Sequence, residues 1–348
     1  MNSLFTLLIG LLFFTCEIFG QCPPAGVTIT SKADLENYAL IYPDCEVIDG
    51  DLHISSADIN DLHAFNNVRK INGSFSLSNN AELTDISGLS SLNQVEGYVR
   101  IQNNVALLSL NGLQNVKRID GDFFYLENSP LVTDLSGLSG LDSVNGIVQI
   151  WAMDGIADLN GLQNLRYING TFAVFSNASL TSFKGIPSLS TINDALRIYE
   201  NPVLVSIEDL PAGLKIEQSL VINDNPLLTS CSAEAICNYL SDPPSFFILN
   251  ANAEGCNGEE QVIAGCETNS SKVNAIQDFT VFPNPGNGII KMENLFQKID
   301  KIEVIDHFGF KKVLIPSHLL NINHLRAGIY IIRVTGDNKI YQTRYLKI

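Results

Sequence analysis

The sequence predicts an all-β protein, in which a parallel β-solenoid of about eight 24-residue coils precedes a small antiparallel β-sandwich. Three observations predict this fold. The second and fourth residues after a recurring glycine are apolar, and a period of two is typical of a strand with one buried face. Beyond residue 275, short apolar runs alternate with Gly and Pro, as antiparallel strands and their turns do. The glycine recurs every 23 to 25 residues, at Gly50, Gly73, Gly97, Gly121, Gly146 and Gly170.

The composition indicates a folded and strongly acidic protein. Of the 348 residues, 45% are hydrophobic and 17% are charged, which argues against disorder. The net charge of −16 argues against binding to nucleic acid or to anionic membranes, because the long-range field repels both. Residues 1–272 carry a net charge of −20 and residues 273–348 carry +4, which predicts a domain boundary near residue 272.

Residues 1–20 are a predicted signal peptide, cleaved after Gly20. Their apolar run, residues 4–14, is too short for a transmembrane helix, which needs about 20 residues. A lipoprotein attached through Cys16 is the alternative, although Phe14 and Thr15 fit a lipid-attachment motif poorly. No other segment is long and apolar enough to form a transmembrane segment.

Six further cysteines agree with export to an oxidising compartment. We expect a bridge between Cys22 and Cys45 at one end of the repeat, and two bridges among the other four, whose pairing the sequence leaves open. Zinc binding is the alternative, but the chain has no CxxC and no companion histidine, so neither a metal nor another cofactor is expected. The disulfide candidates are Cys22, Cys45, Cys231, Cys237, Cys256 and Cys266.

The repeat places similar residues in register in successive coils. Equivalent residues in a parallel ladder stack about 4.8 Å apart, so the apolar columns of all coils form one core. Asp194 and Gln218 continue the register where the glycine is lost. The two predicted core columns are Leu52, Phe75, Val99, Phe123, Val148, Phe172, Leu196 and Leu220, and Ile54, Leu77, Ile101, Tyr125, Ile150, Val174, Ile198 and Ile222.

A column of asparagines predicts an amide ladder at one corner of the coils, because Asn bonds to the backbone and tolerates tight turns. A calcium site at Asn223, Asp224 and Asn225 is the alternative, but it lacks the spacing of a known calcium loop. The column is Asn80, Asn104, Asn128, Asn177, Asn201 and Asn225, interrupted by Met153.

The ends of the solenoid need covers, because the end coils would otherwise expose the core. Residues 31–42 are predicted to form a short helix with Ser31 as its N-cap. Residues 232–240 are predicted to form a closing helix, and residues 245–252 a last strand.

The repeat unit I-x-G-x-L-x-I, followed by L-x-x-L-x-G-L and flanked by cysteine-bearing ends, resembles the receptor L domain over residues 22–266. That domain is the leucine-rich-repeat-like solenoid of insulin and EGF receptor ectodomains. The resemblance implies a right-handed β-helix that binds protein ligands and has no catalytic role. It says little about which ligand is bound.

The outward-facing positions of the middle coils are predicted to form an aromatic face. Contiguous exposed aromatic residues usually mark a binding surface, and Trp, Tyr and Arg are frequent interface anchors. Two other readings are that another layer of this chain covers the face, or that its rings only stabilise the sheet. Sugar stacking on Trp151, Phe175 and Tyr199 is a further hypothesis. The predicted binding residues are Tyr98, Arg100, Phe124, Trp151, Phe175, Arg197 and Tyr199, with Leu126 beside them.

Three motifs in the last 75 or so residues resemble the type A C-terminal sorting domain of the type IX secretion system of Bacteroidota. They are Phe282-Pro283-Asn284-Pro285, Asp306-x-x-Gly309, and Leu325-x-x-Gly328-Ile329-Tyr330 near the end of the sequence. The resemblance implies recognition at the outer membrane, removal of the domain, and release or anchoring of the rest. An adhesive β-sandwich is the alternative. The predicted division is thus signal peptide 1–20, solenoid 21–266, linker 267–275 and sorting domain 276–348.

No sequence motif for catalysis is present, since the chain lacks a P-loop, HExxH and GxSxG. We therefore expect a secreted or surface-displayed, non-enzymatic adhesion protein that recognises an extracellular protein or glycan. Its expected partners are that ligand and the secretion machinery. A structural surface-layer role without a specific ligand and a carbohydrate-active β-helix enzyme are the alternatives.

Overall fold

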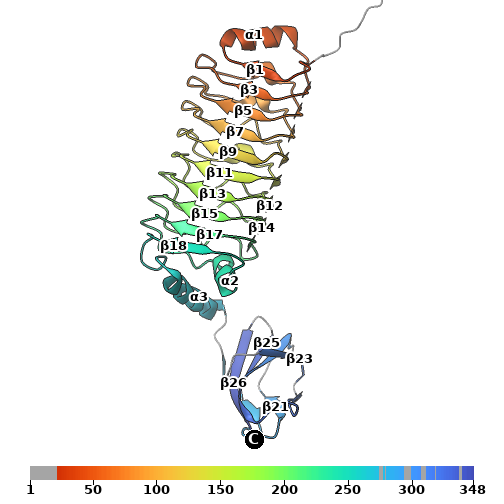
Figure 1. The fold of residues 1–348 in the computed structure, drawn as a ribbon, viewed down its shortest axis with the longest axis vertical. Coiled ribbons are helices and arrows are strands. Elements are labelled where there is room, and N and C mark those ends of the chain that lie inside the picture. The colour runs from red at the N-terminus through yellow and green to blue at the C-terminus, as the bar shows by residue number, and fades with distance from the viewer. Residues whose placement is uncertain are drawn as a thin grey trace, which may run out of the picture. The chain divides into compact units, whose positions relative to one another are not determined.

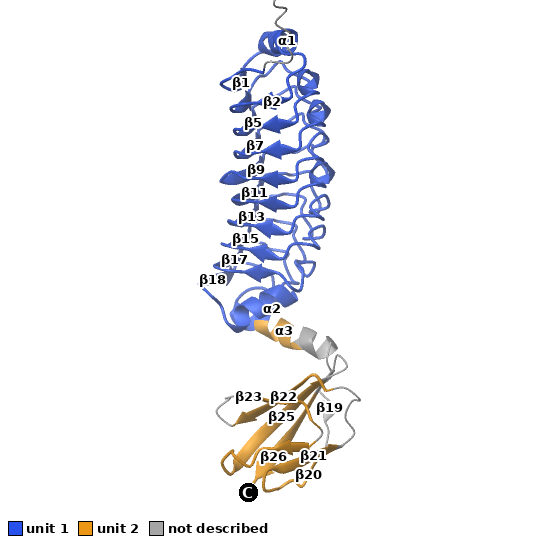
Figure 2. Ribbon diagram, turned by 90° about the vertical axis from the view of Figure 1, so that its right-hand side faces the viewer, with its two compact units in different colours: residues 1–262 blue, residues 263–348 orange. Residues whose placement is uncertain are grey.

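The computed structural model describes residues 22–273, 277–278, 280–293, 299–306, 311–317, 319–336 and 339–348. These residues form two compact units, which divide between Val262 and Ile263 (Figure 2). The predicted signal peptide, with Cys16, lies outside the described residues. Within the described ranges, no helix has both the length and the apolar character needed to cross a membrane.

The first unit is a solenoid built on two parallel sheets (Figure 1). Strands that are neighbours in a sheet come from successive coils, so that Phe172, for example, lies opposite Leu196. The eight predicted coils are confirmed, and one further strand extends the larger sheet at each end. That sheet consists of β1 (Val27–Ile29), β3 (Leu52–Ile54), β5 (Phe75–Ser78), β7 (Val99–Gln102), β9 (Phe123–Glu127), β11 (Ile147–Trp151), β13 (Phe172–Phe175), β15 (Leu196–Tyr199), β17 (Leu220–Asn223) and β18 (Phe247–Asn250).

The second sheet has eight two-residue strands, and short 3-10 helices lie between some of the coils' strands. The 3-10 helices are η1 (His63–Phe65), η2 (Ser87–Leu89) and η3 (Ser136–Leu138). The coils approach closely there, because a Cβ at Gly137 would lie 2.0 Å from the carbonyl oxygen of Leu110. The strands are β2 (Val47–Ile48), β4 (Lys70–Ile71), β6 (Gln94–Val95), β8 (Arg118–Ile119), β10 (Ser143–Val144), β12 (Tyr167–Ile168), β14 (Thr191–Ile192) and β16 (Lys215–Ile216).

The predicted core columns are confirmed in every coil except that of β9. There Phe124 and Leu126 are buried, whereas Phe123 and Tyr125 point outward. The reason is one extra residue between Gly121 and the strand, so that Val99 lies opposite Phe124. The prediction, which counted two and four residues from each glycine, was therefore wrong by one residue in this coil.

A buried amide ladder lies where the strands of the larger sheet end. Asn177 shows its bonding: its Nδ2 donates to the carbonyl oxygen of Ile150 at 3.1 Å, and its Oδ1 accepts from the backbone N–H of Met153 at 3.0 Å. Side chains also bond to each other, as Asn177 does to Asn201 at 3.2 Å. The ladder residues are Asn80, Asn104, Asn177, Asn201, Asn225 and, beyond the prediction, Asn252.

Asn128 was predicted in this ladder and does not belong to it. The residue before each ladder position has a positive φ, which Asn tolerates, and Asn128 with φ 45° takes this exposed corner position. There its Nδ2 donates to Oδ1 of Asn103 at 2.8 Å. The buried position in that coil is occupied by Ser129. The cause is again the extra residue in the coil of β9.

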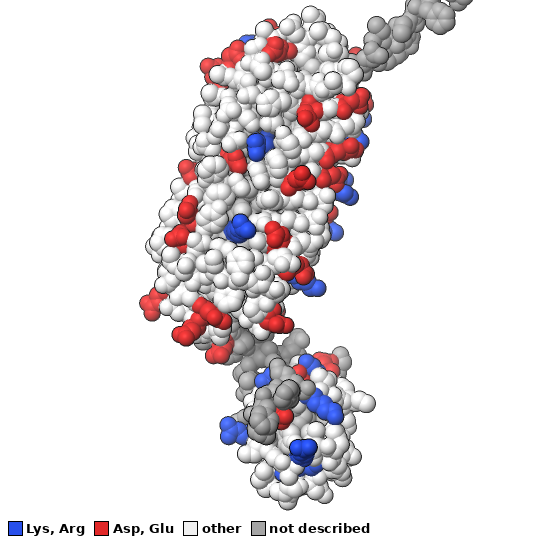
Figure 3. Space-filling view, in the orientation of Figure 1, with Lys and Arg blue, Asp and Glu red and all other residues white. Residues whose placement is uncertain are grey.

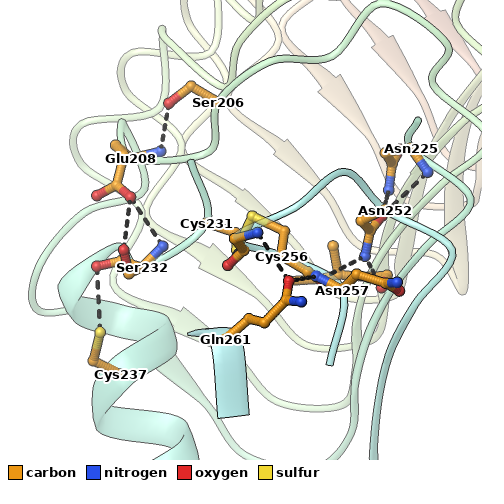
Figure 4. The surroundings of a disulfide bond; sticks show 12 residues. Ser206, Glu208, Asn225, Cys231, Ser232, Cys237, Asn252, Cys256, Asn257 and Gln261 are labelled. Carbon is orange, nitrogen blue, oxygen red and sulfur yellow. Dashed lines mark hydrogen bonds between the residues drawn. A yellow bond between two sulfur atoms is a disulfide. The ribbon is translucent and has the colours of Figure 1, made fainter. Parts of the chain in front are cut away.

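Helices and disulfides cover both ends of the solenoid. Helix α1 (Lys32–Ile41) begins as predicted, with the hydroxyl of Ser31 accepting from the backbone N–H of Asp34 at 3.1 Å. The predicted bridge Cys22–Cys45 is present. At the other end lie α2 (Glu234–Ser241) and the bridge Cys231–Cys256, close to the last rung Asn225–Asn252 of the ladder (Figure 4). Cys237 and Cys266 are also disulfide-bonded.

Helix α3 (Glu259–Val273) was not predicted, and it includes residues 267–273 of the expected linker. Glu259 and Glu260 lie in its first turn, where acidic side chains stabilise a helix. The side chain of Gln261 accepts from the backbone N–H groups of Gly255 and Asn257, at 2.8 and 3.0 Å. These bonds fix the chain just before the helix (Figure 4).

The second unit is a β-sandwich of two sheets. Both sheets contribute to one core, for example through Ile290 and Ile332. All strand pairs are antiparallel except β19–β26, which is parallel. The sheets are β19 (Gln277–Asp278), β26 (Lys339–Lys347), β25 (Gly328–Gly336), β22 (Lys301–Asp306) and β23 (Lys311–Leu314), and β20 (Thr280–Phe282), β21 (Ile289–Glu293) and β24 (Leu319–Asn321).

Replacing a ladder amide should strongly destabilise the solenoid. The variant Asn177→Ala leaves two buried backbone groups, of Met153 and Ile150, without this partner, so we expect a loss of about 3 kcal/mol. Urea unfolding of the full chain, followed by the fluorescence of its single tryptophan, Trp151, measures this loss. The control Asn193→Ala removes an amide that bonds to Asn169 at an exposed corner, and it should cost well under half as much. Equal losses for the two variants would contradict the structural role of the buried ladder.

Candidate functional site

The outer face of the larger sheet carries the predicted aromatic residues. This face is turned toward the viewer in Figures 1 and 3, where it is largely uncharged and acidic side chains gather along its margins. No described segment of the solenoid covers it, since Trp151 is 37% exposed and Arg197 is also exposed. We name as the candidate face the outward residues of β7 to β15, together with Tyr98.

Three rings from successive coils form a stack on this face. The centroids of Trp151 and Phe175 are 5.7 Å apart and those of Phe175 and Tyr199 are 4.5 Å apart, with the ring planes within 13° of parallel. Ala173, two residues before Phe175 on β13, is buried. The stack therefore turns ring faces toward each other and ring edges toward solvent.

A second aromatic group holds an arginine. Tyr98 stacks on Phe123 with centroids 4.3 Å apart, and Phe123 stacks on Tyr125 at 4.2 Å. The guanidinium carbon of Arg100 lies 5.2 Å from the centroid of Phe123 and 5.6 Å from that of Tyr125. Contacts of this kind are attractive, because the ring face is electron-rich. They fix the half-buried Arg100 side chain in place.

A buried carboxyl group lies between the two aromatic groups. Glu127 is 5% exposed, is opposite Trp151 in register, and accepts a hydrogen bond from Nε2 of Gln149 at 2.9 Å. Burial raises the pKa of the Glu127 carboxyl above its ordinary value of 4.5, and the Arg100 guanidinium partly opposes this rise. No ion pair joins Arg100 and Glu127, although both are fully described.

Six of the predicted binding residues lie on the candidate face, and Phe124 does not. Phe124 and Leu126 are in the core, at 1% and 0% exposure, and Phe123 and Tyr125 take their places outside. The 25-residue interval from Gly121 to Gly146 was the available signal for the extra residue. Sequence reasoning also missed Glu127 and Gln149. The predicted residues that lie on the candidate face are Tyr98, Arg100, Trp151, Phe175, Arg197 and Tyr199.

In the second unit, the first sorting motif is bonded to the last strand. The side-chain amide of Asn284 donates to the carbonyl oxygen of Arg344 at 2.8 Å and accepts from the N–H of Leu346 at 2.9 Å. The peptide bonds before Pro283 and Pro285 are cis, and Phe282 is 53% exposed. Tyr330 is buried and its hydroxyl donates to the carbonyl oxygen of Arg326 at 2.9 Å. The predicted turn of Asp306-x-x-Gly309 falls mostly outside the described residues.

Neither unit shows a cluster of side chains suited to a metal ion, as far as the described residues extend. The histidine with a close acidic neighbour, His63, lies in η1 beside Asp61 at 2.9 Å, and both are exposed. The candidate face is thus a surface of rings, two arginines and one buried carboxyl group.

Two family models match the chain. Residues 280–347 match the secretion system C-terminal sorting domain, and residues 44–93 match the receptor L domain. No curated protein and no solved structure matches the chain significantly. The second match covers the first two coils, and the repeat extends the same architecture through the remaining ones. The chain is a secreted protein of the outer cell surface, and its C-terminal unit is a type IX sorting domain.

Removing the charge of Glu127 should stabilise the solenoid at neutral pH. Because the folded state raises this pKa, the fold favours the neutral carboxyl, and stability falls as pH rises from 4.5 through the folded-state pKa. The variant Glu127→Gln keeps an acceptor for Gln149 and loses this dependence, so its melting temperature should exceed that of the wild type at neutral pH but not in acid. The matched control is Glu82→Gln at an exposed corner, which should change neither value. A lower melting temperature of Glu127→Gln at neutral pH would refute this account.

Loss of the Asn284 amide should impair export. The variant Asn284→Ala removes both bonds to the last strand, at a cost of about 1 to 2 kcal/mol to the second unit. In cells with a type IX system, we expect a larger cell-retained fraction by immunoblotting. The control Asn321→Ala, whose side chain accepts only a local bond from Asn323 among those described, should be exported normally.

Proposed function

We propose that the protein is a non-enzymatic binding protein of the bacterial surface, which recognises an extracellular partner through the candidate face. The observation that carries the proposal is the row of partly exposed rings on a face of low charge. Surface patches of this kind usually mark interaction sites, and Trp, Tyr and Arg contribute most to binding in known interfaces.

Export supports the same proposal. We infer that residues 1–20 direct the chain across the inner membrane and that the sorting domain then directs it through the type IX system of a member of the Bacteroidota. The predicted removal of the sorting domain would leave the solenoid as the functional part. The sorting motif residues Phe282, Pro283, Asn284, Pro285, Gly328 and Tyr330 then serve transport and not ligand binding.

The chemistry of the face favours binding over catalysis. Hydrolysis of a glycosidic bond usually needs two carboxyl groups on either side of the bond. Glu127, the carboxyl group between the two aromatic groups, is buried and bonded to Gln149, and Glu200, next to Tyr199, accepts a hydrogen bond from Ser176. These features support a binding role, while assay of product release from polysaccharides addresses the enzymatic alternative.

The triple variant Trp151→Ala, Phe175→Ala and Tyr199→Ala tests the proposal. We expect retention of the full chain on arrays of extracellular proteins, peptides and polysaccharides to fall at least about tenfold, because such anchors dominate interfaces. Circular dichroism checks folding, since this variant lacks the single tryptophan. The control Tyr167→Ala removes a ring of equal exposure, 37%, from β12 of the other sheet and should bind normally.

Two results would count against the proposal. If the wild-type chain is retained by nothing on the arrays, a structural role at the surface is favoured. If the triple variant is folded and binds as the wild type does, the binding site lies elsewhere.

A further inference from the structure

We propose that the candidate face binds an extended protein segment that carries two acidic side chains, one for Arg100 and one for Arg197. This inference rests on the proposed function and names the class of its partner. It follows from three observations. The two arginines form no ion pairs, they lie about 19 Å apart, and the stacked rings turn their edges toward solvent.

Neither arginine forms an ion pair within the described residues, although the charge of Arg100 does act on the buried carboxyl of Glu127. By contrast, Arg118 in β8 and Arg166 just before β12 pair with Asp120 and Asp142. Arg100 is held by the rings of Phe123 and Tyr125, so little side-chain entropy is lost when it binds a carboxylate. Two unpaired cations on a face of low charge complement an anionic partner.

The two arginines occupy one cross-strand column. Arg100 lies opposite Tyr125, which lies opposite Gln149, and the column continues through Ala173 to Arg197. Four strand steps of about 4.8 Å separate the arginines by about 19 Å. An extended peptide rises about 3.4 Å per residue, so acidic residues about six positions apart span this distance. An even spacing also places both on the same side of the peptide, together with the two same-side residues between them.

The stacked rings favour a protein over a polysaccharide. A pyranose ring binds an aromatic residue by lying on its face, but the middle ring, Phe175, has Trp151 on one face and Tyr199 on the other, and each outer ring has one face occupied by Phe175. Ring edges remain exposed, and apolar side chains of a peptide can pack against them. The acidity of residues 1–272, which carry −20, repels a polymer with dense negative charge more strongly than a segment with two acidic side chains placed at the arginines.

The test uses synthetic peptides and the purified full chain. One peptide carries two glutamates at a spacing of about six residues, with leucine or valine at the two same-side positions between them. In a second peptide the glutamates are replaced by lysines, and a third keeps the composition but brings the glutamates closer. A neutral oligosaccharide and a uronic acid oligosaccharide represent the other class of ligand. Fluorescence anisotropy gives each Kd at low and at high NaCl concentration.

We expect the widely spaced glutamate peptide to bind best, and less tightly in high salt. Arg100→Gln and Arg197→Gln should each raise its Kd by about fivefold, the value of one partly exposed ion pair. Arg197→Glu should weaken this peptide further and improve binding of the lysine peptide. The matched control Arg166→Gln, just before β12 and away from the candidate face, should leave every Kd unchanged.

The outcomes separate this inference from the proposed function. If an oligosaccharide binds, no peptide does, and the triple ring variant abolishes that binding, the inference fails and the proposed function stands. If both arginine variants bind the glutamate peptide as the wild type does, the inference fails as well. If neither peptides nor oligosaccharides bind, the inference is overturned, and the proposed function is decided separately by retention on the arrays.

Discussion

The buried asparagine amides set how the coils join, and the rest of the solenoid depends on them. Where a strand of the larger sheet ends, the chain turns through a residue of positive φ, and backbone groups point into the interior. A buried group without a partner costs about 1 to 3 kcal/mol, so this corner needs both a donor and an acceptor. A side-chain amide supplies both, and that of Asn177 reaches the carbonyl oxygen of Ile150 and the N–H of Met153, which both belong to the preceding coil. Ladder amides of this kind therefore join the backbone of the preceding coil to the coil that carries them.

The stacking distance that the ladder maintains also decides the chemistry of the outer face. Parallel strands lie about 4.8 Å apart, which is close to the separation of two stacked rings. Aromatic residues at equivalent positions of successive coils consequently stack on one another, as Phe175 and Tyr199 do at 4.5 Å. A sequence repeat that places rings in one column therefore produces a surface of ring edges. On such a surface, the directional contacts with a partner are made by the polar side chains that lie between the rings.

Much of the fold and part of the candidate face could be predicted from the sequence, because the coil repeats. Repetition reveals the strands, the corners and the ends, and Ser31 and Cys22–Cys45 are where they were expected. Repetition fails at positions that occur once, which is why α3 and the pairing of Cys231 with Cys256 were not predicted. It also cannot reveal the burial of Glu127, because that depends on the side chains of two neighbouring coils rather than on its own position.

The coil of β9 has apolar side chains on both sides of its strand, with Phe123 and Tyr125 outside and Phe124 and Leu126 inside. A slip of one residue reverses the two sides of any strand, and in most coils it would bring a polar residue such as Arg100 into the core. In this coil the slip would bury Phe123 and Tyr125 in place of Phe124 and Leu126. The two registers of the strand therefore differ little in the hydrophobic surface that they bury. A single insertion or deletion next to this strand can therefore replace the surface that a partner meets while the interior stays filled, a route to new specificity that requires no substitution.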